Sequence, residues 1–372
     1  MKIIINKKIF LEVLSKVQGI TNKRTNMTIT ENLLITALND TIELSATDLE
    51  TYFKGIYPAT VEKNGAVLIN SKKLFEIIKE FPEENILIRQ VENKWIKIGD
   101  NKIEYHIVGM EVDNFPTIPA FGETCFYNID SILFKKMIER MIVITSFSEE
   151  KRETVNGILF EFLIKNEKTI LRLVSTDGGR LSIADAVYDE IFDFPDLKDI
   201  IIPKKGMNEV VKFLKSSGSV QIGFQENYCI IKNDNEIIII RLLEGTFLDY
   251  GSIINKENHH IININKQKLL MMLKRMSILA SDVYNGVIFD IQNDKLIISS
   301  TNPTIGESKE EMDIEFTGEH IQVAYNPKFF MDTINLMDDE IVLLYVLDEK
   351  DPAFLEETTD KNYLSIIMPM KV

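Results

Sequence analysis

The apolar positions of this chain follow two periods, one helical and one extended, and the same order of periods occurs three times. Apolar residues recur at helical spacing in three segments that begin at Lys7, Ser131 and Asn265. Each segment is followed by an Asn and a run in which apolar and polar residues alternate, namely ENLLITAL, VNGILFEF and YNGVIFDI. The first period predicts an amphipathic helix and the second a half-buried strand, in three copies.

A second helix is expected in each copy, and its charges recur in register. A lysine is followed four positions later by an acid, the spacing at which opposite charges meet on one helix face. The expected pairs are Lys72 with Glu76, Lys205 with Glu209, and Lys328 with Asp332. A short apolar strand precedes each of these helices. Matching features recur at intervals of roughly 130 residues, which is about the size of one domain.

The remainder of each copy alternates in strand fashion and is interrupted by polar turns such as Asp100-Asn101 and Asn233-Asp234-Asn235. Short turns of this kind join antiparallel strands, because parallel strands need long crossovers. The fold class is therefore α+β, three tandem copies of a domain with two helices and an antiparallel sheet. The expected domains cover residues 1–124, 125–251 and 252–372.

Charge is unevenly distributed along the chain. The formal net charge is −15, yet the six expected helices and their flanks carry more Lys and Arg than Asp and Glu. If one surface gathers these helices, that surface is basic and attracts phosphate, while the rest of the molecule repels it. The simpler interpretation is that the lysines form ordinary solvated helix faces. Aromatic stacking platforms and recognition-helix signatures are absent, so any nucleic-acid contact is expected to be independent of sequence.

A search for reactive chemistry finds little. The chain has no phosphate loop, dinucleotide fingerprint, nucleophile elbow or zinc spacing, and its four histidines do not cluster with carboxylates. We therefore expect no catalytic residue, no metal and no cofactor. Asp177, in STDGGR, is the most tempting catalytic candidate. Asp48 and Asn302 occupy the same place in the other two copies, which favours an Asx-type turn over catalysis.

The cellular context is expected to be a reducing cytoplasm. Cys125 and Cys229 are far apart in the sequence and have no metal or redox spacing, so both are expected to be core or incidental residues. The opening MKIIINKKIF has no signal-peptide core, and no apolar run is long enough to span a membrane.

Three copies of this length, together with VSTDGGRLS, LLEGTFLDYGSII and the final IIMPMKV, resemble the bacterial sliding clamps, the beta subunits of DNA polymerase III. The resemblance covers the whole chain. It implies a non-catalytic homodimer, closed head to tail into a ring, with helices lining the hole and sheets outside. Double-stranded DNA would pass through without sequence preference, and the ring would tether the replicative polymerase and confer processivity.

The resemblance also implies a pocket between the second and third domains that receives short linear peptides from the polymerase, the clamp loader and repair proteins. The matching positions are Val155, Thr176, Gly178, Arg180, Leu181, Leu248, Ile253, Tyr284, Asn326, Phe329, Ile366, Ile367, Met368, Pro369 and Met370. Methionine suits such a pocket because its flexible thioether repacks around different partners. The alternative is that these residues complete the core of the third repeat, and Ile366 and Ile367, on an expected strand, are expected to close its sheet.

Two further sets of residues follow from the resemblance and the charge pattern. The expected DNA-facing residues are Arg24, Lys72, Lys73, Lys135, Lys136, Arg140, Arg152, Lys204, Lys205, Lys212, Lys266, Lys268 and Arg275. The expected dimer interface joins Tyr105 and Ile107 of one copy to Ile278 and Leu279 of the other.

Two alternatives stay open at this point. The first is a metal-dependent nuclease that uses carboxylates such as Asp177 and Asp249, although nothing in the sequence gathers the acids that two-metal chemistry needs. The second is a protein-only scaffold with no DNA partner.

Overall fold

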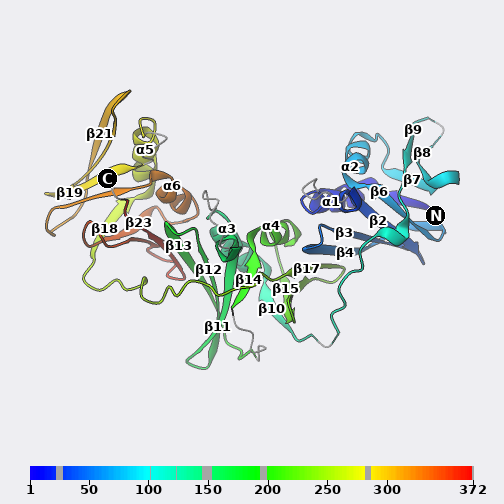
Figure 1. Ribbon diagram of the computed structural model, residues 1–372, viewed down its shortest axis with the longest axis horizontal. Coiled ribbons are helices and arrows are strands. Elements are labelled where there is room, and N and C mark those ends of the chain that lie inside the picture. The colour runs from blue at the N-terminus through cyan, green and yellow to red at the C-terminus, as the bar shows by residue number, and fades with distance from the viewer. Residues whose placement is uncertain are drawn as a thin grey trace. The chain divides into compact units, whose positions relative to one another are not determined.

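The computed structural model describes residues 1–21, 28–100, 102–122, 124–144, 153–192, 199–280 and 286–370 (Figure 1). The chain divides into two compact units, one formed by residues 1–135 and 205–242 and the other by residues 136–204 and 243–372. The middle repeat therefore contributes strands to both units.

Two antiparallel sheets form the first unit. The smaller sheet has, in spatial order, β5 (Thr60–Lys63), β1 (Lys2–Asn6), β7 (Asn85–Gln90), β8 (Trp95–Gly99) and β9 (Glu104–Val108). The larger sheet has β10 (Phe126–Asp130), β15 (Ser219–Gln225), β16 (Tyr228–Lys232), β17 (Glu236–Arg241), β4 (Thr51–Pro58), β3 (Thr41–Thr47), β2 (Asn32–Leu38) and β6 (Gly65–Asn70). Helices α1 (Lys7–Val17) and α2 (Ser71–Glu80) pack against each other.

The second unit has the same plan. Its larger sheet has β14 (Ile200–Pro203), β11 (Gly157–Lys165), β12 (Lys168–Thr176), β13 (Arg180–Tyr188), β25 (Tyr363–Ile367), β24 (Ala353–Glu357), β23 (Ile341–Val346) and β18 (His260–Asn265). Its smaller sheet has β21 (Gly306–Asp313), β20 (Lys295–Asn302), β19 (Val287–Gln292) and β22 (Ile321–Tyr325). Helices α5 (Lys266–Met276) and α6 (Pro327–Asn335) pack together.

Helices α3 (Ser131–Ile142) and α4 (Lys204–Phe213) belong to the middle repeat, and four short 3-10 turns complete the described elements. These turns are η1 (Thr28–Glu31), η2 (Glu92–Lys94), η3 (Val112–Asn114) and η4 (Glu153–Asn156). All strand pairings within the described sheets are antiparallel. The predicted fold class and all six helices are therefore confirmed.

Four of the six described helices begin directly after an Asn whose side chain caps the helix. The side chains of Asn6, Asn70, Asn265 and Asn326 accept hydrogen bonds from the backbone N–H groups at the starts of α1, α2, α5 and α6. An Asn at this position satisfies donors that the helix itself leaves unpaired. The apolar face that the period predicts in α1 is buried, through Phe10, Val13, Leu14 and Val17.

The predicted positions of the second helices are confirmed. The predicted pairing of Glu76 and Glu209 with a lysine four residues before each of them is wrong. Glu76 pairs with Lys73 at 2.8 Å, and Glu209 pairs with Lys212 at 2.8 Å, three residues away in each case. Asp332 receives the guanidinium of Arg180 at 2.9 Å.

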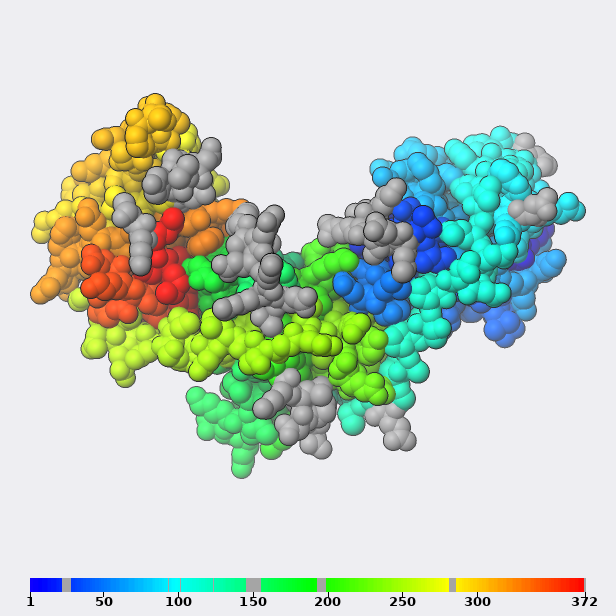
Figure 2. All heavy atoms as spheres, viewed as in Figure 1, coloured from blue at the N-terminus to red at the C-terminus, as the bar shows by residue number. Residues whose placement is uncertain are grey.

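Strand pairing between repeats joins each larger sheet into one piece. In the first unit β17 pairs with β4, and in the second β25 pairs with β13. In the space-filling view the C-terminal segment, coloured red, lies against green atoms of the middle repeat (Figure 2). The predicted domain limits at residues 124 and 251 stay a prediction, because each unit contains one and a half repeats.

A buried ionic network stabilises the junction between the second and third repeats, where β13 pairs with β25. Arg140 of α3 is 3% exposed; it donates to Glu357 at 2.6 Å and to Asp360 at 2.9 Å. Its guanidinium also lies 4.2 Å from the ring centroid of Tyr363, which is on β25. Arg140 was predicted to face DNA, and that prediction is wrong, because burial among carboxylates removes its charge from the surface.

Substituting Arg140 by Gln should lower the free energy of unfolding of this unit by about 3 kcal/mol, because the fully buried Glu357 would lose its cation. Urea denaturation followed by circular dichroism measures the change. Lys168→Gln is the matched control, since Lys168 makes a solvent-exposed pair with Asp189 at 2.7 Å. The control should leave the urea midpoint unchanged. Equal losses in the two variants would contradict the assigned role of the network.

Candidate functional site

The turn between β12 and β13 forms the centre of the expected pocket. Asp177 Oδ1 accepts hydrogen bonds from Gly179 N at 3.1 Å and Arg180 N at 3.0 Å. Thr176 Oγ1 donates to Arg180 O at 2.7 Å and accepts from Gly178 N at 3.1 Å. Gly178 has a φ of +87°, a left-handed conformation that favours glycine.

The same turn is built in the other two repeats. Asp48 Oδ1 accepts from Glu50 N and Thr51 N, and Asn302 Oδ1 accepts from Thr304 N. The Asx-type interpretation of Asp177 is therefore confirmed. Asp249 serves a similar turn, since its Oδ1 accepts from Gly251 N at 3.1 Å. Among the described residues, no three His, Cys, Asp or Glu side chains are grouped so that they could hold a metal ion.

The side chain of Arg180 is buried beneath the residues of the expected pocket. Its side chain is 1% exposed and donates to Asp177 at 3.0 Å, to Asp332 of α6 at 2.9 Å and to the Val143 carbonyl at 3.2 Å. The guanidinium also lies 4.4 Å from the ring centroid of Phe329, which is half-buried. A guanidinium with this many partners is not available to a ligand, so it positions Phe329.

Several of the expected pocket residues are core. Leu181 and Ile366 belong to one buried cluster, against which Ile253 packs, and Ile367 is fully buried. Thr176 is also buried. The expectation that Leu181, Ile366 and Ile367 line the pocket is wrong, because all three side chains are buried, while the expectation that Ile366 and Ile367 close the sheet of the third repeat is confirmed by β25.

The accessible part of the pocket is smaller. Leu248 is 47% exposed and Met368 is 37% exposed. Five further residues are half-buried, namely Val155, Asn326, Phe329, Pro369 and Met370. Tyr284 lies outside the described residues. An apolar surface that is partly covered in this way suits a small apolar ligand.

The C-terminal tail extends from the larger sheet of the second unit to β22 of the smaller sheet. Beyond Ile367 its backbone continues to pair, since Met368 N donates to Gly179 O at 2.9 Å and Met370 N donates to Ala324 O at 2.8 Å. These bonds fix the path of the tail beside the turn and beside β22.

A loop on the other side positions Leu248. Its neighbours Phe247 and Tyr250 are buried in the same core cluster. The Tyr250 hydroxyl donates to Glu161, and burial together with the adjacent carboxylate raises the pKa of Tyr250. Leu248 is therefore held out at the surface by two anchored aromatic rings.

Apart from the buried Arg140, the described basic residues that were expected to face DNA divide into an exposed set and a half-buried set. Lys72, Lys73, Lys212, Lys268 and Arg275 are exposed. Lys73, Lys212 and Arg275 each pair with a nearby carboxylate, those of Glu76, Glu209 and Glu310. The prediction that these side chains are available at the helix surface is supported by their exposure, while their contact with DNA stays a prediction.

The half-buried set consists of Lys135, Lys136, Lys204, Lys205 and Lys266. Lys136 pairs with Asp338 at 2.7 Å, Lys205 with Asp48, and Lys266 donates to the Met337 carbonyl. Lys204 donates to two backbone carbonyls and was wrongly expected at the DNA surface, because its ammonium is turned inward. Arg24 and Arg152 lie outside the described residues.

Acidic residues are absent from the first turn of all six described α-helices. Acids are favoured there because the N-terminal end of the helix dipole is positive. Exposed lysines stand there instead, for example Lys8, Lys72 and Lys268. Helix termini and lysines thus add their positive potential. Sequence reasoning found the lysines but missed this second contribution.

The expected interface residues differ in exposure. Tyr105 on β9 is 39% exposed and Ile107 is half-buried. Ile278, just past the end of α5, is 75% exposed, and Leu279 is half-buried. Ile278 is thus a large apolar side chain that the described residues leave mostly exposed.

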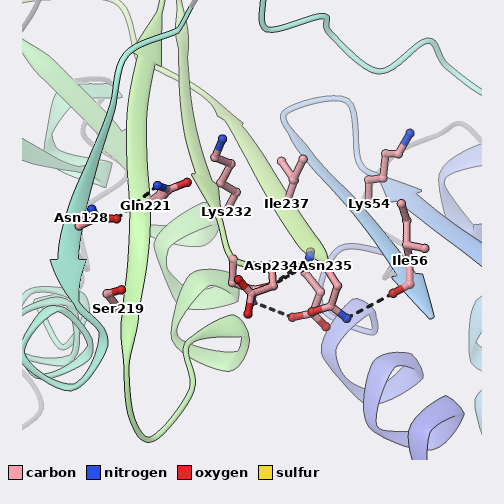
Figure 3. A pocket seen from close by; sticks show the side chains of 11 residues that line it. Lys54, Ile56, Asn128, Ser219, Gln221, Lys232, Asp234, Asn235 and Ile237 are labelled. Carbon is pink, nitrogen blue, oxygen red and sulfur yellow. Dashed lines mark hydrogen bonds between the residues drawn. The ribbon is translucent and has the colours of Figure 1, made fainter. Parts of the chain in front are cut away.

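A hollow of about 470 Å³ on the first unit was not anticipated (Figure 3). Its floor is a cross-strand row of Asn128, Gln221, Lys232, Ile237 and Lys54. Lys54 already pairs with Glu43 at 2.7 Å, and the Lys232 ammonium lies 3.5 Å from the ring centroid of Phe126. Since both cations have partners within the unit, no ligand is assigned to this hollow.

Cysteine placement agrees with an incidental role. Cys125 is exposed, while Cys229 is buried and burial raises the pKa of its thiol. Among the described helices, none has the length and apolar character needed to cross a bilayer.

Comparison with known proteins identifies the class. Three family models match in series, those of the N-terminal, central and C-terminal domains of the DNA polymerase III beta subunit, over residues 1–119, 128–249 and 251–371. The beta sliding clamp of Chlamydia pneumoniae is 27% identical over 377 residues, covering 100% of this chain and 99% of the relative. That of Pseudomonas putida is 24% identical over 373 residues, covering 99% of each.

Solved structures agree on the fold. The DNA polymerase sliding clamp of Bacillus subtilis has a TM-score of 0.90 and 24% identity, covering 100% of this chain and 99% of that one. The Bartonella birtlesii clamp, bound to griselimycin, has a TM-score of 0.92 and 24% identity, with 100% of each chain covered. The three repeats thus define a clamp fold of three α+β domains. The chain belongs to the DNA polymerase III beta subunits, the bacterial beta sliding clamps, which are non-catalytic polymerase subunits.

Proposed function

We propose that two copies of this chain close head to tail into a ring that encircles duplex DNA and tethers the replicative polymerase to its template. The observation that supports this most directly is a repeated strand junction. The third strand of the β15–β17 series pairs with β4, and the third strand of the β23–β25 series pairs with β13.

One chain also contains the two strands that a third junction of this kind would join, β9 and β21, but they do not pair with each other in the described sheets. β9 ends the series of the first repeat and pairs with β8; β21 ends the series of the third repeat and pairs with β20. Neither strand has a second ladder among the described sheets. A second copy can supply β21 to β9 and receive the reciprocal contact, which is a heterologous interface that closes. Ile278 and Tyr105 would be covered in the same contact.

Duplex DNA is the partner that fits the helices. Exposed lysines at helix N-termini attract phosphate without reading bases. The acidic remainder of a chain of net charge −15 would repel DNA from other surfaces. A topological hold requires no tight contact, so processivity follows from ring closure.

The pocket around Leu248 and Met368 is proposed to bind short peptides of the polymerase, the clamp loader and repair proteins. Griselimycin, which the Bartonella birtlesii clamp binds, is the ligand that we propose as a probe of this pocket. The half-buried Phe329 and the flexible thioethers of Met368 and Met370 offer an adaptable apolar surface.

Ring closure predicts dependence on DNA topology. Once loaded by its clamp loader, the protein should stay on nicked circular duplex through gel filtration in 0.5 M salt, as a ring held by topology is insensitive to screening. Cutting the circle once should release it within minutes. Equal retention on circular and linear DNA would contradict the proposal.

The interface predicts a dimer that depends on Ile278. Ile278→Asp should weaken dimerisation at least about tenfold, because the contact would have to desolvate a carboxylate. Sedimentation at sub-micromolar concentration measures the shift from dimer to monomer. Ile261→Asp, at an exposed site on β18, is the control and should stay dimeric. A monomeric wild type would remove the ring.

The tail predicts a separable loss of peptide binding. Removal of residues 368–372 should abolish griselimycin binding and polymerase stimulation and leave the dimer intact, because Ile366 and Ile367 keep their ladder with β13. Met368→Ala should weaken binding, while Met271→Ala, at an exposed methionine of α5, should not. A truncated chain that fails to fold would instead make the tail part of the core.

A further inference from the structure

Lys204 joins two segments of the pocket wall that are distant in the sequence. It is the first residue of α4, and its Nζ donates to the carbonyl of Val155 at 2.9 Å and to the carbonyl of Thr176 at 3.3 Å. Val155 lies in η4, and Thr176 is the last residue of β12. One ammonium therefore ties together three segments, η4, the end of β12 and the start of α4.

Both carbonyls belong to residues that shape the pocket. Val155 is a half-buried pocket position, and Thr176 anchors the turn through its bonds to Gly178 N and Arg180 O. Hydrogen bonds from a charged donor are shorter and stronger than neutral ones, and low surrounding polarity strengthens them further. A loss of this donor would free η4 and the turn to move independently.

The charge of this ammonium is finely balanced. Burial lowers the pKa of Lys204 to about 8, the nearby Asp177 carboxylate opposes that decrease, and the Arg180 guanidinium adds to it. Arg180 is itself paired with Asp177 and with Asp332. The surrounding groups therefore leave Lys204 able to lose its proton in mildly alkaline solution.

We propose that Lys204 is a positioning residue for the peptide pocket, and that its protonated ammonium holds the Val155 and Thr176 walls in the arrangement that binds ligand. The proposal rests on the proposed function of the pocket and adds a residue that does not touch the ligand. It also explains why a lysine at the start of a basic helix turns away from the surface.

Linkage fixes the sign of the pH effect. If the binding-competent pocket needs the charged ammonium, ligand binding favours the protonated form, and affinity falls as pH rises through about 8. Below that pH the ammonium is already charged in the free protein, so affinity levels off. Bound ligand should raise the pKa of Lys204 in return.

The experiment measures griselimycin affinity by calorimetry from pH 6.5 to 9.5 on the full-length dimer. Wild type should bind several-fold more weakly at the alkaline end, with a midpoint near pH 8. Lys204→Arg keeps a cation throughout this range and should lack that step. Lys204→Met should bind about tenfold more weakly at pH 7, with no step. Lys165→Met, at an exposed site at the end of β11, should match wild type.

The outcomes separate two failures. If wild type does not bind griselimycin at pH 7, the proposed function of the pocket fails. If wild type binds and Lys204→Arg shows the same pH step, the step belongs to another group and the role of Lys204 is overturned. Should Lys204→Met not fold, as judged by its thermal transition, the comparison of wild type with Lys204→Arg still decides.

Discussion

Antiparallel pairing between strands of different repeats is the constraint on which the rest of this structure depends. The ladder between β13 and β25 brings Arg180 opposite Ile367, although the two residues are far apart in the sequence. The proposed pocket lies where this ladder ends, because the turn before Arg180 and the tail after Ile367 leave the sheet at the same place. Forming the site is thus inseparable from docking the third repeat onto the second.

The buried cations follow from the same junction. Arg140 lies beside β25 and pairs with Glu357 and Asp360 of the third repeat, while Arg180, on β13, pairs with Asp332 of the third repeat and with Asp177 of its own turn. A buried ion pair seldom adds much net stability, but removing one partner is costly. Such pairs therefore penalise every alternative pairing in which the repeats meet out of register, which matters in a chain with three similar copies.

Periodicity and local turn chemistry carried most of the prediction from sequence. The six helices, the antiparallel sheets and the Asx turn at Asp177 depend on neighbours within a few residues, so their signals are local. The fates of Arg140 and Lys204 could not be predicted in this way. Glu357 is 217 residues from Arg140, and nothing in a basic helix indicates which of its cations will meet a distant acid. Burial of Leu181 was missed for the same reason, since its core cluster includes Phe354 and Ile366 of the third repeat.

Internal ion pairs on the helices are consistent with a protein that slides. Three of the exposed cations, Lys73, Lys212 and Arg275, already contact carboxylates of Glu76, Glu209 and Glu310. A phosphate must compete with such a carboxylate, so each contact with DNA exchanges one ion pair for another and releases fewer counterions than a free lysine would. Helix termini without acids keep the local potential positive, while the paired carboxylates would keep any single contact with phosphate weak. In the proposed ring, a duplex would then move past many weak contacts, and the exposed lysines would let a strongly acidic chain accommodate DNA.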